Sequence, residues 1–225
     1  MKTFILVSEK KWHVSLFNKL KNENKNHWIL INKKSDFTLD NLHKINPDKV
    51  FIPHWSYIIK EEIFTNFSCI VFHMTDLPYG RGGSPLQNLI VAGHESTKIS
   101  ALKVTKGVDA GDIYLKKELS LLGSAEEIFI RSAKIIFLMI QEIIDNDIEP
   151  VPQEGEVIEF KRRKPSDGDI SKLESIEEVF DYIRMLDAEG YPNAFLEIGN
   201  FRLEFSRASY KSTDSILADV RISKR

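Results

Sequence analysis

Short apolar runs alternate with amphipathic stretches along the first third of the chain. The runs have the length of buried strands and span residues 4–7, 28–31, 50–52 and 69–72. The stretches between them have the apolar spacing of helices and span residues 12–20, 39–45 and 58–67. Buried strands separated by helices are typical of a parallel sheet with helices on both faces, so the pattern predicts an α/β fold.

The same kind of pattern continues to residue 149. A helix is predicted over 85–91, with Ser84 as its N-cap and Pro85 at its first position. Residues 99–104 and 113–121 are predicted to be extended, and residues 125–144 carry the apolar pattern of a long helix.

A change in composition divides the rest of the chain from this part. Residues 150–169 hold three prolines, two glycines and the basic run 161–164, which is typical of a linker or arm. A helix is predicted after it at 176–186, then a hairpin from 194–198 to 201–205 turning at Gly199-Asn200, and a last strand at 216–222. We therefore predict a main domain over 1–150, a linker over 151–169 and a small α+β C-terminal subdomain over 170–225.

The overall charge and the cysteine content narrow the class of protein. The formal net charge of −2 gives no general attraction to nucleic acid or to an anionic membrane, so neither is expected as a partner. A basic run of four residues is usually a solvated face, with RNA binding as the alternative. The single cysteine, Cys69, excludes a disulfide within the chain, and no apolar stretch reaches the about 20 residues of a membrane span. We expect a cytoplasmic protein.

Several common active-site motifs are missing. The first strand is followed by Ser8-Glu9-Lys10-Lys11-Trp12 and not by the glycines of a dinucleotide-binding turn. The sequence also has no phosphate-binding P-loop, no G-x-S-x-G elbow and no H-E-x-x-H. Most histidines have no partner at metal-ligand spacing, so no metal is expected.

Two segments carry candidate chemistry. His73 ends a predicted strand before a glycine-rich loop, at the place where open α/β sheets bind ligands. Asp109 lies in the loop Thr105 to Asp112, which holds two aspartates and two glycines. The residues alone leave a structural role open for His73 and favour a plain turn for the loop. If the two side chains meet, the carboxylate would orient the imidazole for acid–base work.

Together the two segments resemble the folate-dependent formyltransferases, which include methionyl-tRNA formyltransferase, glycinamide ribonucleotide transformylase and the sugar N-formyltransferases. That family carries N-x-H-x-S-x-L-P, then R-G, then a D-x-G-D loop. The matching positions here are His73, Leu77-Pro78, Arg81-Gly82, Pro85, Gln87 and Asp109-Ala110-Gly111-Asp112. The likeness covers most of residues 1–150, and the tail from Phe160 to Phe205 is also similar to the start of the family's C-terminal domain.

The resemblance implies a Rossmann-like, mostly parallel sheet and an enzyme that takes a formyl group from N10-formyltetrahydrofolate, with residues 1–150 as the catalytic domain. It implies that His73 and Asp109 are catalytic. By the same resemblance, the folate would lie against Trp55, Ile58, Arg81, Gly82, Val104, Thr105 and Gly107.

The sequences of residues 73–78 and 184–192 are most similar to those of the branch that modifies amino sugars, with pseudaminic acid biosynthesis as the nearest comparison. A nucleotide-linked amino sugar is therefore the expected acceptor, and a homodimer stays open. One departure matters, because Val71 stands where the family has its catalytic asparagine. A degenerate folate-binding protein and a formyltetrahydrofolate hydrolase are the alternatives.

Overall fold

The computed structural model describes residues 1–23 and 26–225. The chain forms two compact units that interleave along the sequence. The first consists of residues 1–82, 97–119 and 130–159, and the second of residues 83–96, 120–129 and 160–225. The predicted boundaries at 150 and 169 refer to chain order, whereas these units draw segments from both sides of those boundaries.

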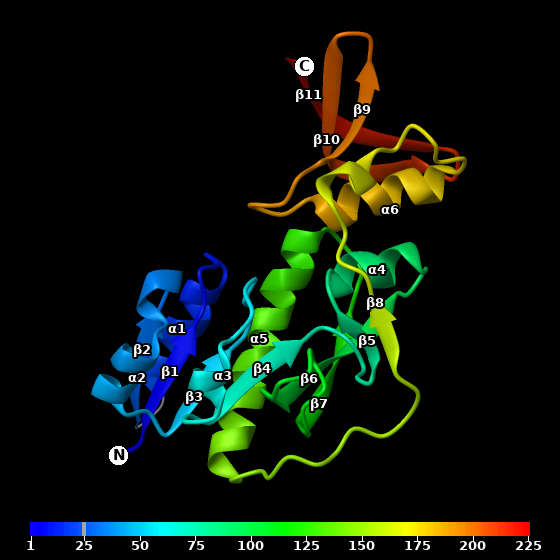
Figure 1. The fold of residues 1–225 in the computed structure, drawn as a ribbon. Coiled ribbons are helices and arrows are strands. Elements are labelled where there is room, and N and C mark those ends of the chain that lie inside the picture. The colour runs from blue at the N-terminus through cyan, green and yellow to red at the C-terminus, as the bar shows by residue number, and fades with distance from the viewer. Residues whose placement is uncertain (24–25) are drawn as a thin grey trace. The chain divides into compact units, whose positions relative to one another are not determined.

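The first unit is built on a six-stranded sheet (Figure 1). Its strand order is β2-β1-β3-β4-β6-β7. The strands are β1 (Thr3–Val7), β2 (His27–Ile31), β3 (Lys49–Ile52), β4 (Cys69–His73), β6 (Ser96–Lys103) and β7 (Ile113–Ser120). The pairs β1–β2, β1–β3 and β3–β4 are parallel, and β4–β6 is antiparallel. The prediction of a mostly parallel α/β sheet is confirmed.

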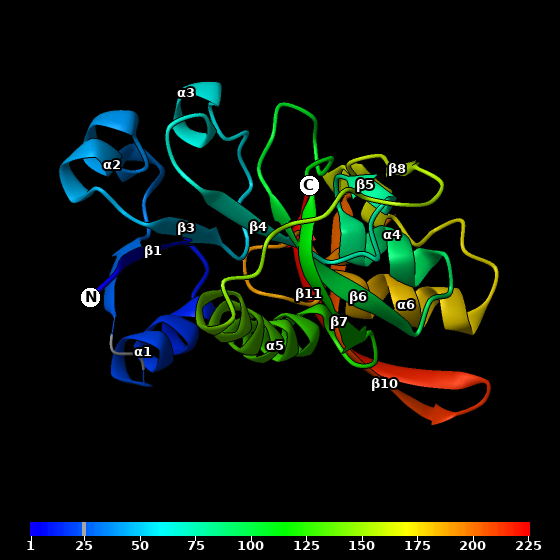
Figure 2. The same cartoon turned by 90° about the horizontal axis from the view of Figure 1, so that it is seen from below.

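Helices cover both faces of this sheet. They are α1 (His13–Glu23), α2 (Leu39–Ile45), α3 (Glu61–Phe64) and α5 (Ala125–Asp145), and a short 3-10 turn spans Lys34–Asp36. Figure 2 shows α1 and α5 on one side of the sheet and α2 and α3 on the other. Alternating strand residues divide between two cores, as the period of a strand requires. The rings of Phe4, Trp28 and Phe51 pack together in tilted and edge-to-face contacts, whereas Ile5, Val50 and Ile52 join a second buried cluster with Leu42 and Ile63.

The helix predicted over 58–67 is much shorter in the structure. Lys60 has the extended angles φ −65° and ψ 142°, so α3 begins only at Glu61 and ends at Phe64. Ile58 is 82% exposed, so this apolar residue does not mark the buried face of a helix. The pattern was wrong here because it treated a solvent-facing isoleucine as a core position.

Two short strands were not predicted. β5 (Tyr79–Gly82) lies in the segment interpreted as a glycine-rich loop, and β8 (Ile158–Phe160) lies in the segment interpreted as a linker. The two pair with each other, and Ile158 N–H donates to the Pro78 carbonyl at 3.4 Å.

The second unit contains α4 (Pro85–Val91), α6 (Ile176–Leu186), a 3-10 turn at Pro165–Gly168 and an antiparallel sheet in the order β11-β10-β9. The strands are β9 (Ala194–Ile198), β10 (Phe201–Ser212) and β11 (Ser215–Lys224), so the predicted hairpin and last strand are confirmed. The hairpin turns at Gly199, whose φ of +56° suits glycine.

Ser84 precedes α4 as predicted, but it does not act as a side-chain cap. Its backbone is left-handed, with φ +53°, and its side chain makes no hydrogen bond to the helix. The Ser84 hydroxyl accepts a hydrogen bond from Arg163 N–H at 3.0 Å instead.

Among the described residues, no helix combines the length and hydropathy needed to cross a membrane.

Candidate active site

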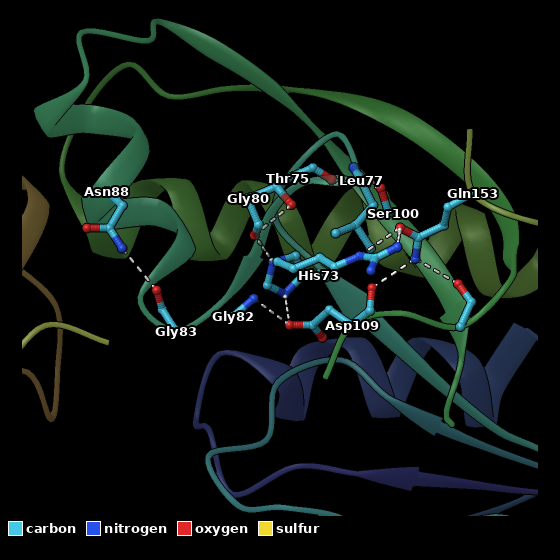
Figure 3. Close-up of polar contacts among 12 residues, drawn as sticks. His73, Thr75, Leu77, Gly80, Gly82, Gly83, Asn88, Ser100, Asp109 and Gln153 are labelled. Carbon is cyan, nitrogen blue, oxygen red and sulfur yellow. Dashed lines mark hydrogen bonds and ion pairs between the residues drawn. The ribbon is translucent and has the colours of Figure 1, made fainter. Parts of the chain in front are cut away.

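His73 ends β4, where the strand leaves the sheet, and is 9% exposed. Its Nε2 lies 2.7 Å from the Gly80 carbonyl oxygen, and its Nδ1 lies 3.4 Å from Asp109 Oδ2 (Figure 3). A carbonyl oxygen can only accept, so Nε2 carries a hydrogen in this arrangement. Nδ1 is therefore the nitrogen that can gain or lose a proton, on the side of the carboxylate.

Asp109 is brought to His73 by the loop between β6 and β7. Its φ of +49° is left-handed, a conformation that is uncommon for residues other than glycine but tolerated by aspartate. Asp109 Oδ2 also accepts a hydrogen bond from Gly82 N–H at 3.0 Å. The main chain of β5 thus helps to hold the carboxylate beside the imidazole (Figure 3).

Gly111 permits the tight path of this loop. A Cβ at Gly111 would lie 1.8 Å from the Lys103 carbonyl oxygen, a distance that no side chain could adopt. Lys103 N–H donates to the Asp112 carbonyl at 2.9 Å, so the loop returns directly onto the end of β6. The predicted turn is therefore held against the end of β6 by this hydrogen bond, and it carries Asp109.

The connection from β4 to β5 is held from within the sheet. The fully buried Ser100 donates from its hydroxyl to the Thr75 carbonyl at 2.7 Å and accepts from Leu77 N–H at 3.3 Å. Thr75 Oγ1 in turn donates to the Gly80 carbonyl at 3.3 Å, which is the carbonyl that faces His73. The Leu77-Pro78 peptide bond is cis. Sequence reasoning missed Ser100 and Thr75, although a serine within an apolar strand was a usable signal.

Asp76, on the same connection, forms ion pairs with two lysines. Lys116 Nζ lies 2.5 Å from its Oδ1, and Lys98 Nζ lies 2.9 Å from its Oδ2. Burial alone would raise the pKa of the Asp76 carboxyl, but the hydrogen bonds from Lys116 and Lys98 leave that pKa below its ordinary value. The ion pairs of the Asp76 carboxylate therefore connect this segment to β6 and β7.

Two of the residues expected to bind the folate adjoin the His73–Asp109 pair. Gly82 donates its N–H directly to Asp109, and Arg81 lies beside it on β5. The Arg81 guanidinium donates to Gln153 Oε1 from Nε at 3.2 Å and from Nη2 at 2.8 Å. Gln153 was not predicted, because it lies in the segment that was interpreted as a linker.

The other expected folate residues occupy two loops. Thr105 and Gly107 are exposed on the loop that carries Asp109, whereas Val104 packs against the core and donates its N–H to the Cys69 carbonyl at 2.9 Å. Trp55 follows β3, and its ring packs against Phe37 with a centroid separation of 5.6 Å.

Trp55 and Val104 contact the same buried cluster, so the structure brings the two loops to one region of the core. Ile58, in contrast, points to solvent. The residues expected to bind the donor or to act on it therefore lie on these two loops, on β5 and at His73.

Val71 occupies the position where the resemblance implies an asparagine. Its side chain packs against Leu77, Leu102 and Ile113 and offers no hydrogen-bond donor. Any stabilisation of a developing oxyanion must therefore come from another group.

Across residues 1–23 and 26–225, no three histidine, cysteine, aspartate or glutamate side chains are grouped as a metal ion would need.

Comparison with known protein families agrees with this geometry. A family model described as formyl transferase matches residues 6–128, and one described as the C-terminal domain of methionyl-tRNA formyltransferase matches residues 165–223. A methionyl-tRNA formyltransferase of Ehrlichia ruminantium (strain Gardel) is 31% identical over 184 residues. That alignment covers 79% of this chain, which spans 59% of the length of the relative.

Solved structures show the same relationship. A structure described as methionyl-tRNA formyltransferase from Clostridium thermocellum is 51% identical, covers 100% of both chains and has a TM-score of 0.97. A 4-N formyltransferase from Francisella tularensis shares the fold, with 16% identity, a TM-score of 0.65 and coverage of 87% of this chain and 92% of that one. The chain belongs to the formyl transferase family.

Proposed function

We propose that this protein transfers a formyl group from N10-formyltetrahydrofolate to a primary amine. The observation that supports this most strongly is the contact of His73 Nδ1 with Asp109 Oδ2 at the end of β4, in a chain that belongs to the formyl transferase family. The amine nitrogen would bond to the formyl carbon of the donor, the bond from that carbon to N10 would break, and N10 would take up a proton to leave as tetrahydrofolate. The residues of the chain then have to remove a proton from the amine and stabilise the charge that develops.

The hydrogen bonds of His73 suggest how it works. The amine must lose a proton as it attacks, and Nδ1 is the ring nitrogen that can take it, because Nε2 is engaged by the Gly80 carbonyl. Asp109 would then face a doubly protonated imidazole and stabilise its charge. In this proposal Gly80 keeps the ring in one orientation, and the carboxylate lies beside the same nitrogen that receives the proton.

The loop that carries Asp109 is suited to hold the donor. A pterin offers several hydrogen-bonding groups in one plane, and exposed main chain can pair with them without a particular side chain. Thr105 and Gly107 are exposed on this loop. A Cβ at Gly107 would lie 2.8 Å from that of Ala110, so the loop has a close turn that favours glycine. We assign donor binding to this loop, with Trp55, Ile58, Val104, Arg81 and Gly82 completing the expected site.

For the acceptor we propose the amine of a nucleotide-linked amino sugar, in pseudaminic acid or other surface-glycan biosynthesis. The net charge of −2 provides no general attraction for a tRNA. The sequence of residues 73–78 and 184–192 also resembles the amino-sugar branch.

Methionyl-tRNA is the second candidate acceptor. The solved structure at 51% identity, which aligns over the whole of both chains, is described as a methionyl-tRNA formyltransferase. The family model matched by residues 165–223 is named for the same enzyme. The basic run Lys161 to Lys164 would be the place for a tRNA contact.

An acceptor screen tests these proposals. Purified protein and N10-formyltetrahydrofolate would be incubated with nucleotide-linked amino sugars, including pseudaminic acid precursors, and separately with methionyl-tRNA. We expect one amino sugar to gain one formyl mass. A gain on methionyl-tRNA alone would select the second candidate. Donor cleavage without any acceptor would indicate a hydrolase, and folate binding without cleavage would indicate a degenerate enzyme.

A further inference from the structure

We propose that Gln153 is a positioning residue that holds Asp109 against His73. This inference rests on the proposed function, because it assigns Gln153 a part in the same site. Gln153 follows α5 and lies in a segment whose prolines and glycine are typical of a linker. Its side chain nevertheless makes four hydrogen bonds to residues of the candidate site.

The amide nitrogen of Gln153 grips the Asp109 loop at two points. Nε2 donates to the Asp109 carbonyl at 2.8 Å and to the Gly111 carbonyl at 2.8 Å (Figure 3). A primary amide has two hydrogens, and each is used by one of these carbonyls. The two acceptors flank Ala110, so the side chain spans the part of the loop whose conformation directs the Asp109 carboxylate.

The amide oxygen of Gln153 joins this loop to β5. Oε1 accepts both bonds from the Arg81 guanidinium, and the next residue, Gly82, donates its N–H to Asp109 Oδ2. One side chain therefore contacts both segments that meet at the carboxylate. Only an amide supplies two donors and an acceptor in this geometry, whereas a carboxylate supplies acceptors alone.

The backbone around Gln153 is anchored well enough to support such a role. Val151 pairs with Ile113 at the start of β7 through two hydrogen bonds of 2.7 and 2.9 Å. Asp109 needs support, because a left-handed backbone is strained for a residue other than glycine and persists only when its surroundings hold it. Gln153 supplies two of the contacts that hold it.

The test compares Gln153→Glu with a matched control, Asn41→Asp. Gln153→Glu retains an acceptor for Arg81 but turns a carboxylate toward two carbonyls. Asn41 Nδ2 donates to the Asp36 carbonyl at 2.8 Å, so Asn41→Asp removes the same kind of bond from α2. Gln153→Met, which loses both donors without adding charge, serves if the glutamate variant does not fold.

The first measurement is the ¹⁵N NMR signals of the His73 ring, which report its contact with Asp109 whether or not formyl is transferred. We expect Gln153→Glu to move these signals in the same direction as Asp109→Asn, and Asn41→Asp to leave them in place. Unmoved His73 signals in a folded Gln153→Glu or Gln153→Met protein would overturn the inference. If the Gln153→Glu signals move and the wild type transfers formyl to no acceptor, the inference is upheld and the proposed function is rejected.

Kinetics give the second measurement. A misplaced Asp109 should lower kcat by on the order of 10²-fold, and any rise in the KM for N10-formyltetrahydrofolate should accompany that fall, because the donor is assigned to the same loop. Adding Gln153→Glu to Asp109→Asn should cost almost nothing more, because Gln153 acts through Asp109. A full multiplication of the two losses, or a rise in KM without a fall in kcat, would overturn the inference.

Discussion

His73 and Asp109 show how much a single contact depends on the groups around it. The imidazole is oriented by the Gly80 carbonyl, and the Gly80 carbonyl is itself bonded to Thr75. The carboxylate is held by Gly82 on one side. Motifs in the sequence predicted that the two side chains belong to one site, and the structure places them 3.4 Å apart. Their catalytic roles stay a proposal.

Gly111 should be intolerant of even one added carbon. In Gly111→Ala the Cβ would meet the Lys103 carbonyl, so the loop must move and carry Asp109 away from His73. We expect kcat to fall by on the order of 10²-fold. The control is Gly199→Ala, whose Cβ would meet nothing within 4 Å and whose strain, from a φ of +56°, is confined to the turn between β9 and β10. Equal kcat values for the two variants in a steady-state assay would contradict this view of the loop.

His13 makes the stability of the protein depend on pH. Burial, with smaller effects of His54 and Lys10, lowers the pKa of His13 from 6.5 to about 3, while its Nδ1 lies 2.8 Å from Ser8 Oγ. The unfolded chain therefore takes up a proton below about pH 6.5 that the folded protein does not, so stability falls as the pH falls.

Between about pH 7 and about pH 5 this one group should lower the free energy of unfolding by about 2 kcal/mol. Urea denaturation at both pH values measures the effect. His13→Gln should lose about 2 kcal/mol less than the wild type over the same interval. The same loss in both proteins would show that His13 is not buried in its neutral form.

The helices and strands divide into those with a local signal and those without one. α4 and α6 were predicted with the bounds they have, because the proline that starts α4 and the apolar spacing of α6 act within a few residues. β5 and β8 form only because residues 79–82 meet residues 158–160, and no local pattern records that pairing. Gln153 was missed for the same reason, since its partners Arg81 and Asp109 are far from it in sequence.

α6 offers a test at the level of one helix. Ser175 accepts a hydrogen bond from Glu178 N–H at 3.1 Å, and the Glu178 carboxylate accepts one from Ser175 N–H at 3.3 Å, which is a capping box. Ser175→Ala should lower the free energy of unfolding by about 1 kcal/mol. Ser56→Ala, at an exposed position outside every helix and strand, is the control for denaturation. No difference between the two variants would show that the cap contributes nothing.

The molecule as a whole consists of two interleaved units, and family models match parts of both. The mostly parallel sheet of the first unit could be predicted because buried strands and helices alternate along the chain. The interleaving could not, because residues 83–96 and 120–129 join the second unit through contacts distant in sequence.

The most direct test of the central claim is the release of tetrahydrofolate from N10-formyltetrahydrofolate, followed in the presence and absence of the acceptor that gains the formyl mass. The wild type should release tetrahydrofolate only with acceptor, in step with formylated product. His73→Asn should be slower by on the order of 10²–10⁴-fold with nearly unchanged folate affinity. Wild-type turnover by His73→Asn would contradict the assignment of His73 as the proton acceptor.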